Sequence, residues 1–250
     1  MTASPLTIPA GGVTLPALLS LPRRARGLVV FVHGSGSSRL SPRNQAVATQ
    51  LQQAGLATLL FDLLSSGEME RDRIDGSLRF RLDLCRDRLL DSLRWLAAQP
   101  ALAALLPVGL FGASSGAAAA LQAAAERPDA VAAVVSRGGR PDLAGEALGS
   151  VRAPTLLIVG GEDGEVLRLN REAAARLRCP HRLEVVPGAT HLFEEPGSLD
   201  LVAQLASDWF LCHLPGSGQA LKLPITAPFP PAQAPGGPQE RRSWSQDPCP

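Results

Sequence analysis

Short runs of consecutive apolar residues alternate along most of this chain with longer segments in which apolar residues recur at helical spacing. The runs predict strands at residues 27–33, 57–63, 108–113, 130–136, 155–159 and 182–186. The longer segments predict helices at residues 42–54, 76–99, 115–126, 166–177 and 199–214. A hairpin is expected at residues 6–21, around the turn Ala10-Gly11-Gly12, and the charged segment 65–75 is expected to be a loop.

This alternation predicts an α/β fold with a doubly wound, mostly parallel sheet. Strands that are apolar on both faces are typical of a sheet covered by helices on each side, and right-handed crossovers distribute the helices over both faces. A chain of 250 residues is long enough for one such domain. From residue 215 on, Pro, Gly, Ser and Gln replace the large aliphatic residues. We therefore predict a domain at residues 1–214 and a disordered tail at residues 215–250.

Composition narrows the possible partners and compartment. The chain has 24 basic and 23 acidic residues, which gives no electrostatic reason to expect a nucleic-acid or membrane partner. It has neither a signal-peptide pattern nor an apolar run long enough to cross a bilayer. Its 4 cysteines are scattered, which favours a reducing compartment, and no cysteine or histidine pair has zinc-site spacing. We expect a cytoplasmic protein without a metal.

The first candidate for chemistry is the pentapeptide Gly112-Ala113-Ser114-Ser115-Gly116. It follows a predicted strand and precedes a predicted helix, so the chain must turn sharply at Ser114. Only small neighbours such as Gly112 and Gly116 leave room for that turn. The turn presents the Ser114 hydroxyl as a nucleophile and directs the Ser115 N–H towards a developing oxyanion. Plain helix capping is the alternative interpretation.

A second glycine-rich loop, His33-Gly34-Ser35-Gly36, follows the first long parallel strand. Ligands of open parallel sheets bind at the carboxyl ends of the strands, so this loop is expected beside Ser114. The Ser35 N–H is our candidate for a second oxyanion donor, and His33 is expected to orient the loop. A phosphate-binding loop is disfavoured because the Gly-Lys-Ser/Thr ending is absent.

Two later strand ends supply a carboxylate and a base. Glu162 and Asp163 follow the strand at 155–159 and compete for the role of orienting a histidine, with Asp163 preferred. Either residue could instead cap the following helix. His191 is the histidine in the loop after the last strand, and the order nucleophile, acid, base is the one expected for this architecture.

These motifs resemble those of the α/β-hydrolase superfamily, and within it the dienelactone-hydrolase-like branch. The matching segments are His33–Gly36, Gly112–Gly116, Gly161–Val166 and Gly188–His191, and the resemblance covers roughly residues 5–214. It implies a Ser114–His191–Asp163 triad, an oxyanion hole formed by the Ser35 and Ser115 N–H groups, and no cofactor. Dienelactone hydrolases proper carry a cysteine where this chain has Ser114, which favours an ester or thioester over a lactone. No long lid insertion is present, so an open pocket for small or polar substrates is expected.

The expected function is therefore that of a serine hydrolase that cleaves a small-molecule ester through an acyl-enzyme. An acyltransferase with the same triad and a non-catalytic binding protein of the same fold are the alternatives. Arg39, Arg43 and Arg137 follow strands at the same edge of the sheet, and planar guanidinium groups suit anions. Arg39 and Arg137 are accordingly candidates for binding an anionic substrate group, unless they pair with nearby acidic residues.

Overall fold

The chain folds around one eight-stranded sheet, as a computed structural model that describes residues 3–214 shows. The strands are β1 (Ser4–Ala10), β2 (Val13–Ser20), β3 (Leu28–Val32), β4 (Ala57–Phe61), β5 (Val108–Ala113), β6 (Val131–Arg137), β7 (Thr155–Gly160) and β8 (His181–Val186). Their order across the sheet is β1-β2-β4-β3-β5-β6-β7-β8. The expected tail at 215–250 lies outside the described residues.

The sheet is parallel from β4 to β8, and β1 and β2 add an antiparallel edge. β1 and β2 form the predicted hairpin, and β2 pairs with β4. β4 lies on one side of β3 and β5 on the other, so the order in which strands are added reverses at β3. As a result β5, which leads into Ser114, lies near the middle of the sheet. This arrangement confirms the predicted doubly wound α/β fold, and residues 3–214 carry no large lid.

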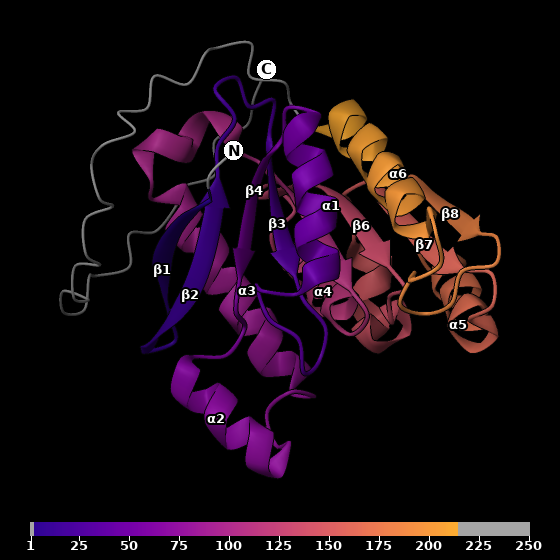
Figure 1. Cartoon of the computed structure of the whole chain (residues 1–250), viewed down its shortest axis with the longest axis horizontal. Helices are drawn as coiled ribbons and strands as arrows, with labels where there is room; N and C mark the ends of the chain where they lie inside the picture. The colour runs from indigo at the N-terminus through magenta and orange to yellow at the C-terminus, as the bar shows by residue number, and fades with distance from the viewer. Residues whose placement is uncertain (1–2, 215–250) are drawn as a thin grey trace, which may run out of the picture.

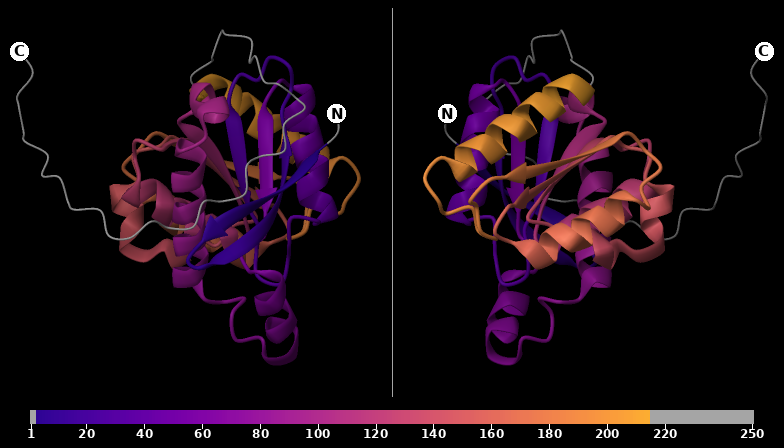
Figure 2. Two further views of the ribbon diagram at one scale, coloured as in Figure 1. Left: turned by 90° about the vertical axis from the view of Figure 1, so that its left-hand side faces the viewer. Right: turned by 90° about the vertical axis from the view of Figure 1, so that its right-hand side faces the viewer.

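Helices cover both faces of the sheet (Figures 1 and 2). They are α1 (Pro42–Gln53), α2 (Ser66–Asp75), α3 (Leu82–Ala97), α4 (Gly116–Glu126), α5 (Gly164–Ala174) and α6 (Ser198–His213), together with the 3-10 segments η1 (Pro100–Leu105) and η2 (Pro141–Ser150). α1 and α6 pack against each other over one face, and α3 and α4 pack over the other. Each face has its own apolar cluster, because the inward-pointing side chains of every strand alternate between the two layers.

Two expectations for the segment between β4 and β5 are wrong. Residues 66–75, predicted to be a loop, form the helix α2, and the following helix begins at Leu82 instead of residue 76. Ser65 accepts a hydrogen bond from the Glu68 N–H, and Glu68 accepts one from the Ser65 N–H. This capping box starts α2, and Gly76 ends it in a left-handed conformation. The charged composition of residues 65–75 indicated a loop, although the capping residues Ser65 and Glu68 favour a helix.

The packing leaves little space between helices and sheet. A Cβ placed on Gly109 of β5 would lie 2.6 Å from the Phe210 ring, so the glycine makes room for this aromatic side chain of α6. α4 is rich in alanine, and most of its residues are buried. Within residues 3–214, every helix is too short or too polar to cross a bilayer.

Candidate active site

Ser114 stands at the sharp turn between β5 and α4. Its φ angle is +50°, in the left-handed region that residues with a side chain rarely adopt. A Cβ on Gly112 would lie 2.5 Å from Ala117 Cα, and one on Gly116 would lie 2.2 Å from the Val32 carbonyl oxygen. Any larger residue at either glycine would therefore push the turn apart, and the serine is held in its strained conformation by the packing around it.

The loop after β3 lies against this turn. A Cβ on Gly34 would come within 3.0 Å of Ser114 Cβ and 3.1 Å of the Ala113 carbonyl oxygen. Gly34 thus permits the close approach that the sequence analysis predicted for this loop. Ser115 is the N-cap of α4, so its N–H has no acceptor within the helix.

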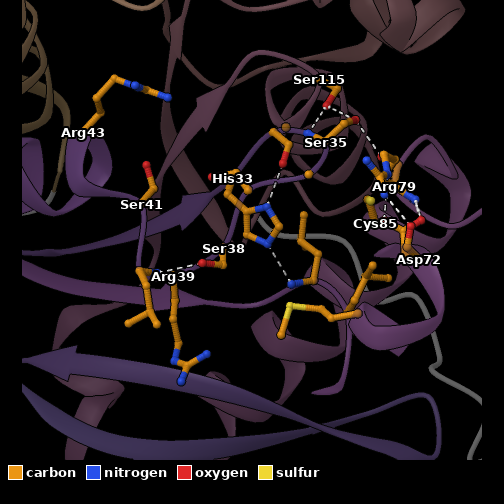
Figure 3. A pocket seen from close by; sticks show the side chains of 18 of the residues that line it. His33, Ser35, Ser38, Arg39, Ser41, Arg43, Asp72, Arg79, Cys85 and Ser115 are labelled. Carbon is orange, nitrogen blue, oxygen red and sulfur yellow. Dashed lines mark hydrogen bonds and ion pairs between the residues drawn. The ribbon is translucent and has the colours of Figure 1, made fainter. Parts of the chain in front are cut away.

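Ser35 and Ser115 are joined by hydrogen bonds (Figure 3). The Ser35 N–H donates to Ser115 Oγ at 2.9 Å, and Ser35 Oγ donates to the Arg79 carbonyl oxygen at 2.6 Å. The single hydroxyl hydrogen of Ser35 is donated to the Arg79 carbonyl oxygen. Ser115 Oγ is therefore the donor in the 2.8 Å contact between the two hydroxyls. The Ser35 N–H, a predicted oxyanion donor, is thus engaged with a side chain.

His33 links the loop after β3 to the main chain that follows β4. Its Nε2 accepts from the Leu63 N–H at 3.1 Å, so Nδ1 carries the proton and donates to the Gly34 carbonyl oxygen at 2.9 Å. Burial lowers the pKa of His33, and the hydrogen bond to Gly34 and the nearby Asp62 oppose this shift only in part. His33 is therefore neutral and fixed in one tautomer, which suits an orienting role.

His191 lies in the loop between β8 and α6. Its Nδ1 donates to Asp163 Oδ2 at 2.6 Å, a short, charge-assisted geometry. Asp163 precedes α5 without capping it through its side chain, and Glu162 is exposed. The structure thus brings Asp163, not Glu162, to His191.

Ser114 and His191 both adjoin the end of β6. The Ser114 N–H donates to the Arg137 carbonyl oxygen at 3.2 Å. A Cβ on the next residue, Gly138, would lie 3.1 Å from the His191 carbonyl oxygen and 3.6 Å from its Nδ1. Among the hydrogen bonds of residues 3–214 none joins Ser114 Oγ to His191. In ligand-free active sites such contacts are often long and tighten when substrate binds.

The three arginines at this edge have different partners. The Arg39 N–H donates to Asp62 Oδ1 at 2.6 Å, and the Arg39 guanidinium pairs with Asp62 Oδ2. The Asp62 side chain is fully buried. Arg43 Nη1 pairs with Glu194 Oε1 at 2.9 Å. The Arg137 side chain is buried, and its Nε and Nη1 atoms have no hydrogen-bond partner in the described part of the chain. Its guanidinium lies 5.8 Å from the centre of the Phe193 ring.

A cleft of about 620 Å³ opens beside Ser115 (Figure 3). The loop from His33 to Arg43 forms one wall, and residues of α2 and the start of α3 form the other. Asp72 of α2 accepts from the Leu78 and Arg79 N–H groups and from Arg79 Nε, which fixes the segment that leads into α3. The charged residues 65–75 indicated a loop, so this wall was not expected from the sequence. The Ser65-x-x-Glu68 pattern is the signal that could have revealed it.

Residues 3–214 contain no group of three His, Cys, Asp or Glu side chains arranged to hold a metal ion. Burial raises the pKa of the Cys85 thiol in the cleft wall to about 11, so this cysteine is not a thiolate at neutral pH. The strained Ser114 and the His191–Asp163 pair are the candidates for chemistry at this edge of the sheet.

A doubly wound sheet with a strained serine between a central strand and its helix defines the α/β type of hydrolase. Comparison with known proteins agrees. Residues 23–139 match the family described as "Serine aminopeptidase, S33". A solved dienelactone hydrolase from Anabaena variabilis is 54% identical, with a TM-score of 0.83, and the alignment covers 85% of this chain and 98% of that one. The chain therefore belongs to the α/β-hydrolase superfamily, in its dienelactone-hydrolase-like branch.

Other matches are a solved structure with a similar fold and two longer proteins. Est1E from Butyrivibrio proteoclasticus shares the fold at 17% identity, with a TM-score of 0.69 over 83% of this chain and 97% of that one. Two Mycobacterium tuberculosis proteins, each named "Putative phosphoribosyl transferase", are 59% identical over 209 residues. The match covers 84% of this chain but 46% of each of theirs, so the chain spans about half the length of these relatives.

Proposed function

We propose that this hydrolase cleaves a carboxylic ester or thioester through a covalent acyl-enzyme, with Ser114 as nucleophile, His191 as base and Asp163 as the carboxylate that orients the histidine. The observation that carries the proposal is the left-handed backbone of Ser114 at the turn from β5 to α4. Strain of this kind persists only where the surroundings impose it, and it is concentrated at functional sites. Here the close packing that Gly112 and Gly116 permit imposes it.

The proposed reaction has two halves. His191 Nε2 takes the Ser114 proton as Oγ attacks the carbonyl carbon, and the same nitrogen then protonates the leaving alcohol or thiol. Water, deprotonated by His191, attacks the acyl-enzyme and releases the acid, which restores the Ser114 hydroxyl. In the neutral imidazole, the hydrogen bond from Nδ1 to Asp163 selects the tautomer whose lone pair is on Nε2, as the base requires.

The oxyanion of both tetrahedral intermediates would be bound by backbone N–H groups. The Ser115 N–H has no partner within α4 and serves directly. The Ser35 N–H serves once the Ser115 side chain rotates away, because in the present structure it donates to Ser115 Oγ. Each such donor is worth about 3 kcal/mol of transition-state stabilisation.

The name of the mycobacterial relatives is compatible with this proposal. The part of each relative that matches this chain is 59% identical to it, so we expect the same hydrolase fold there. The match covers 46% of each relative, and the other 54% (100 − 46) lies outside it. We infer that the phosphoribosyl transferase activity in their name belongs to that remaining part. The aligned half would supply a hydrolase joined to it.

A fluorophosphonate probe tests the nucleophile, since it modifies only an activated serine. The wild-type protein is expected to be labelled, Ser114→Ala is expected to lose the label and ester hydrolysis together, and the exposed Ser77→Ala is the matched control that keeps both. Equal labelling of wild type and Ser114→Ala, or labelling of neither, would refute the assignment. Product analysis with an added alcohol separates hydrolysis from acyl transfer, because only a transferase forms the new ester as its main product.

A further inference from the structure

Residues 137–140, here named the β6–η2 segment, hold the main chain of the proposed nucleophile from both sides. The Ser114 N–H donates to the Arg137 carbonyl oxygen at 3.2 Å. The Arg140 N–H donates in turn to the Ser114 carbonyl oxygen at 3.0 Å. The position of the β6–η2 segment therefore helps to set the position of the strained turn that carries the Ser114 hydroxyl.

The β6–η2 segment also lies against the proposed base. A Cβ on Gly138 would lie 3.1 Å from the His191 carbonyl oxygen and 3.6 Å from His191 Nδ1. The Gly138 N–H donates to the Ile158 carbonyl oxygen of β7 at 2.8 Å, so the segment is still bound to the sheet at this residue. Beyond Gly138 the chain leaves the sheet, and η2 begins at Pro141. The part that binds the Ser114 carbonyl oxygen thus lies outside the strand ladder.

Asn170 of α5 binds the segment where it leaves the sheet. Its Nδ2 donates to the Gly139 carbonyl oxygen at 2.9 Å and to the Val166 carbonyl oxygen at 2.8 Å. Both partners are acceptors, so the amide nitrogen and not the amide oxygen faces them. The side chain is fully buried, and its Oδ1 has no hydrogen-bond partner within residues 3–214. Such an atom destabilises a fold, so the bond to Gly139 is what distinguishes asparagine from a more stable apolar residue here.

The helix α5 joins this contact to the carboxylate of the proposed triad. Asp163 is the N-cap of α5, and its Oδ2 accepts from His191 Nδ1. Asn170 follows almost two helical turns later, so the two positions share a face of the helix and lie about 10 Å apart along its axis. Val166 and Ala173, on the same face, are also buried. One rigid element therefore carries both the acid and the side chain that binds the β6–η2 segment.

We propose that Asn170 is a positioning residue of this active site: by binding the Gly139 carbonyl oxygen it fixes the β6–η2 segment, and thereby aligns Ser114 with His191 and Asp163. The inference rests on the proposed function, because it concerns the alignment of the same three residues. Asn170 is fully buried and acts through the main chain, not on the substrate. The effect is expected in the chemical step, because a misplacement of about 1 Å can lower a rate about 100-fold.

Two substitutions remove the bond to Gly139. Asn170→Leu keeps a branched side chain without a donor, and its kcat for a 4-nitrophenyl ester is expected to fall about 10- to 100-fold with KM nearly unchanged. Fluorophosphonate labelling of Ser114 is expected to slow in the same proportion, because it uses the same nucleophile. Asn170→Ser is the smaller variant. A helical serine hydroxyl bonds to the carbonyl oxygen four residues earlier, here that of Val166, so the same loss of kcat is expected.

Thr155→Val is the matched control. Thr155 is fully buried, and its Oγ1 donates to the Ala153 carbonyl oxygen at 3.0 Å, so the substitution also removes a buried donor to the main chain. It does so at the amino end of β7, away from the candidate site. A lower Tm with unchanged kcat is therefore expected.

Asn170→Gln separates positioning from support of the fold. It keeps the amide on a longer side chain, so it is expected to retain more of the wild-type kcat than Asn170→Leu, although overpacking lowers its Tm. Activity that follows the amide and not the Tm is a result that a merely structural role would not produce. Less activity in folded Asn170→Gln than in Asn170→Leu would contradict positioning by the amide.

Hydrogen exchange follows the contact directly. The Arg140 amide, which donates to Ser114, is expected to exchange faster in Asn170→Leu than in wild type, while the amides of β4 are unaffected. Wild-type kcat and labelling in folded Asn170→Leu and Asn170→Ser, or an equal loss of kcat in Thr155→Val, overturns the inference. A wild-type protein that neither hydrolyses esters nor takes the label refutes the proposed function, and with it the alignment that Asn170 is proposed to maintain.

Discussion

At the residue scale, function depends on how each polar side chain is partnered. Arg39 follows β3 and Arg137 ends β6, so both lie at the carboxyl edge of the sheet. Asp62 pairs with Arg39, whereas no acidic residue within residues 3–214 pairs with Arg137. His33 and His191 are likewise the same residue type with opposite environments. His33 is buried, with both ring nitrogens engaged by the main chain, whereas His191 pairs with a carboxylate through Nδ1 alone.

The partner of His191 leads to a prediction at this scale. Asp163→Asn is expected to lower kcat about 10⁴-fold with little change in stability, because an amide stabilises the wrong tautomer of the histidine. Steady-state hydrolysis of a 4-nitrophenyl ester measures the effect. Glu162→Gln alters the adjacent, exposed carboxylate and is the matched control, expected to keep wild-type kcat. A loss in Glu162→Gln as large as that in Asp163→Asn would contradict the assignment.

At the element scale, short local signals decide where helices begin. α2 has a capping box at Ser65 and Glu68 and a left-handed Gly76 at its end, so a highly polar segment still forms a helix. It projects from the body of the fold and forms one wall of the cleft (Figure 1). Through Asp72 it also holds the segment that leads to Arg79, whose carbonyl oxygen accepts from Ser35.

The capping box gives a prediction for this element. Ser65→Ala removes the acceptor of the Glu68 N–H and is expected to cost about 1 kcal/mol of helix stability. Because α2 projects from the sheet, we expect the loss to be local. Hydrogen exchange of the α2 amides should then quicken about fivefold while the amides of β5 are unaffected. Ser66→Ala, one residue further on and outside the cap, is the control, and equal acceleration in both variants would show that the cap is not the cause.

At the scale of the whole molecule, two helical layers hold one sheet, and the candidate site lies where the parallel strands end. Residues from β3, β5, β6, β7 and β8, or from the loops that follow them, meet at this edge. α6 packs with α1 over one face of the sheet, where Phe210 fills the space above Gly109. A Cβ on Gly27 would lie 2.7 Å from a methyl group of Leu214, the residue that follows α6. The last described helix is therefore an integral part of the core.

Truncation tests this conclusion. A chain that ends after Leu214 is expected to keep the Tm and the esterase activity of the full chain, because the described residues already form an apolar cluster on each face of the sheet. A chain that ends after Ser207 loses Phe210 and Leu214 and is expected to lose about 3 kcal/mol or more of unfolding free energy. Thermal denaturation followed by circular dichroism measures both. A lower Tm of the first truncation would mean that residues 215–250 contribute to the fold.

The sequence by itself determined the fold class, the order of the strands and of every α-helix except α2, and the loops that carry Ser114, Asp163 and His191. Those features follow from local pattern: apolar runs specify buried strands, and glycines around a serine specify a sharp turn. Tertiary structure alone decided which side chains are partnered. The proximity of Asp62 to Arg39, the contact of Ser35 with Ser115 and the isolation of Arg137 all depend on residues from different strands, whose positions are set by packing across the whole sheet.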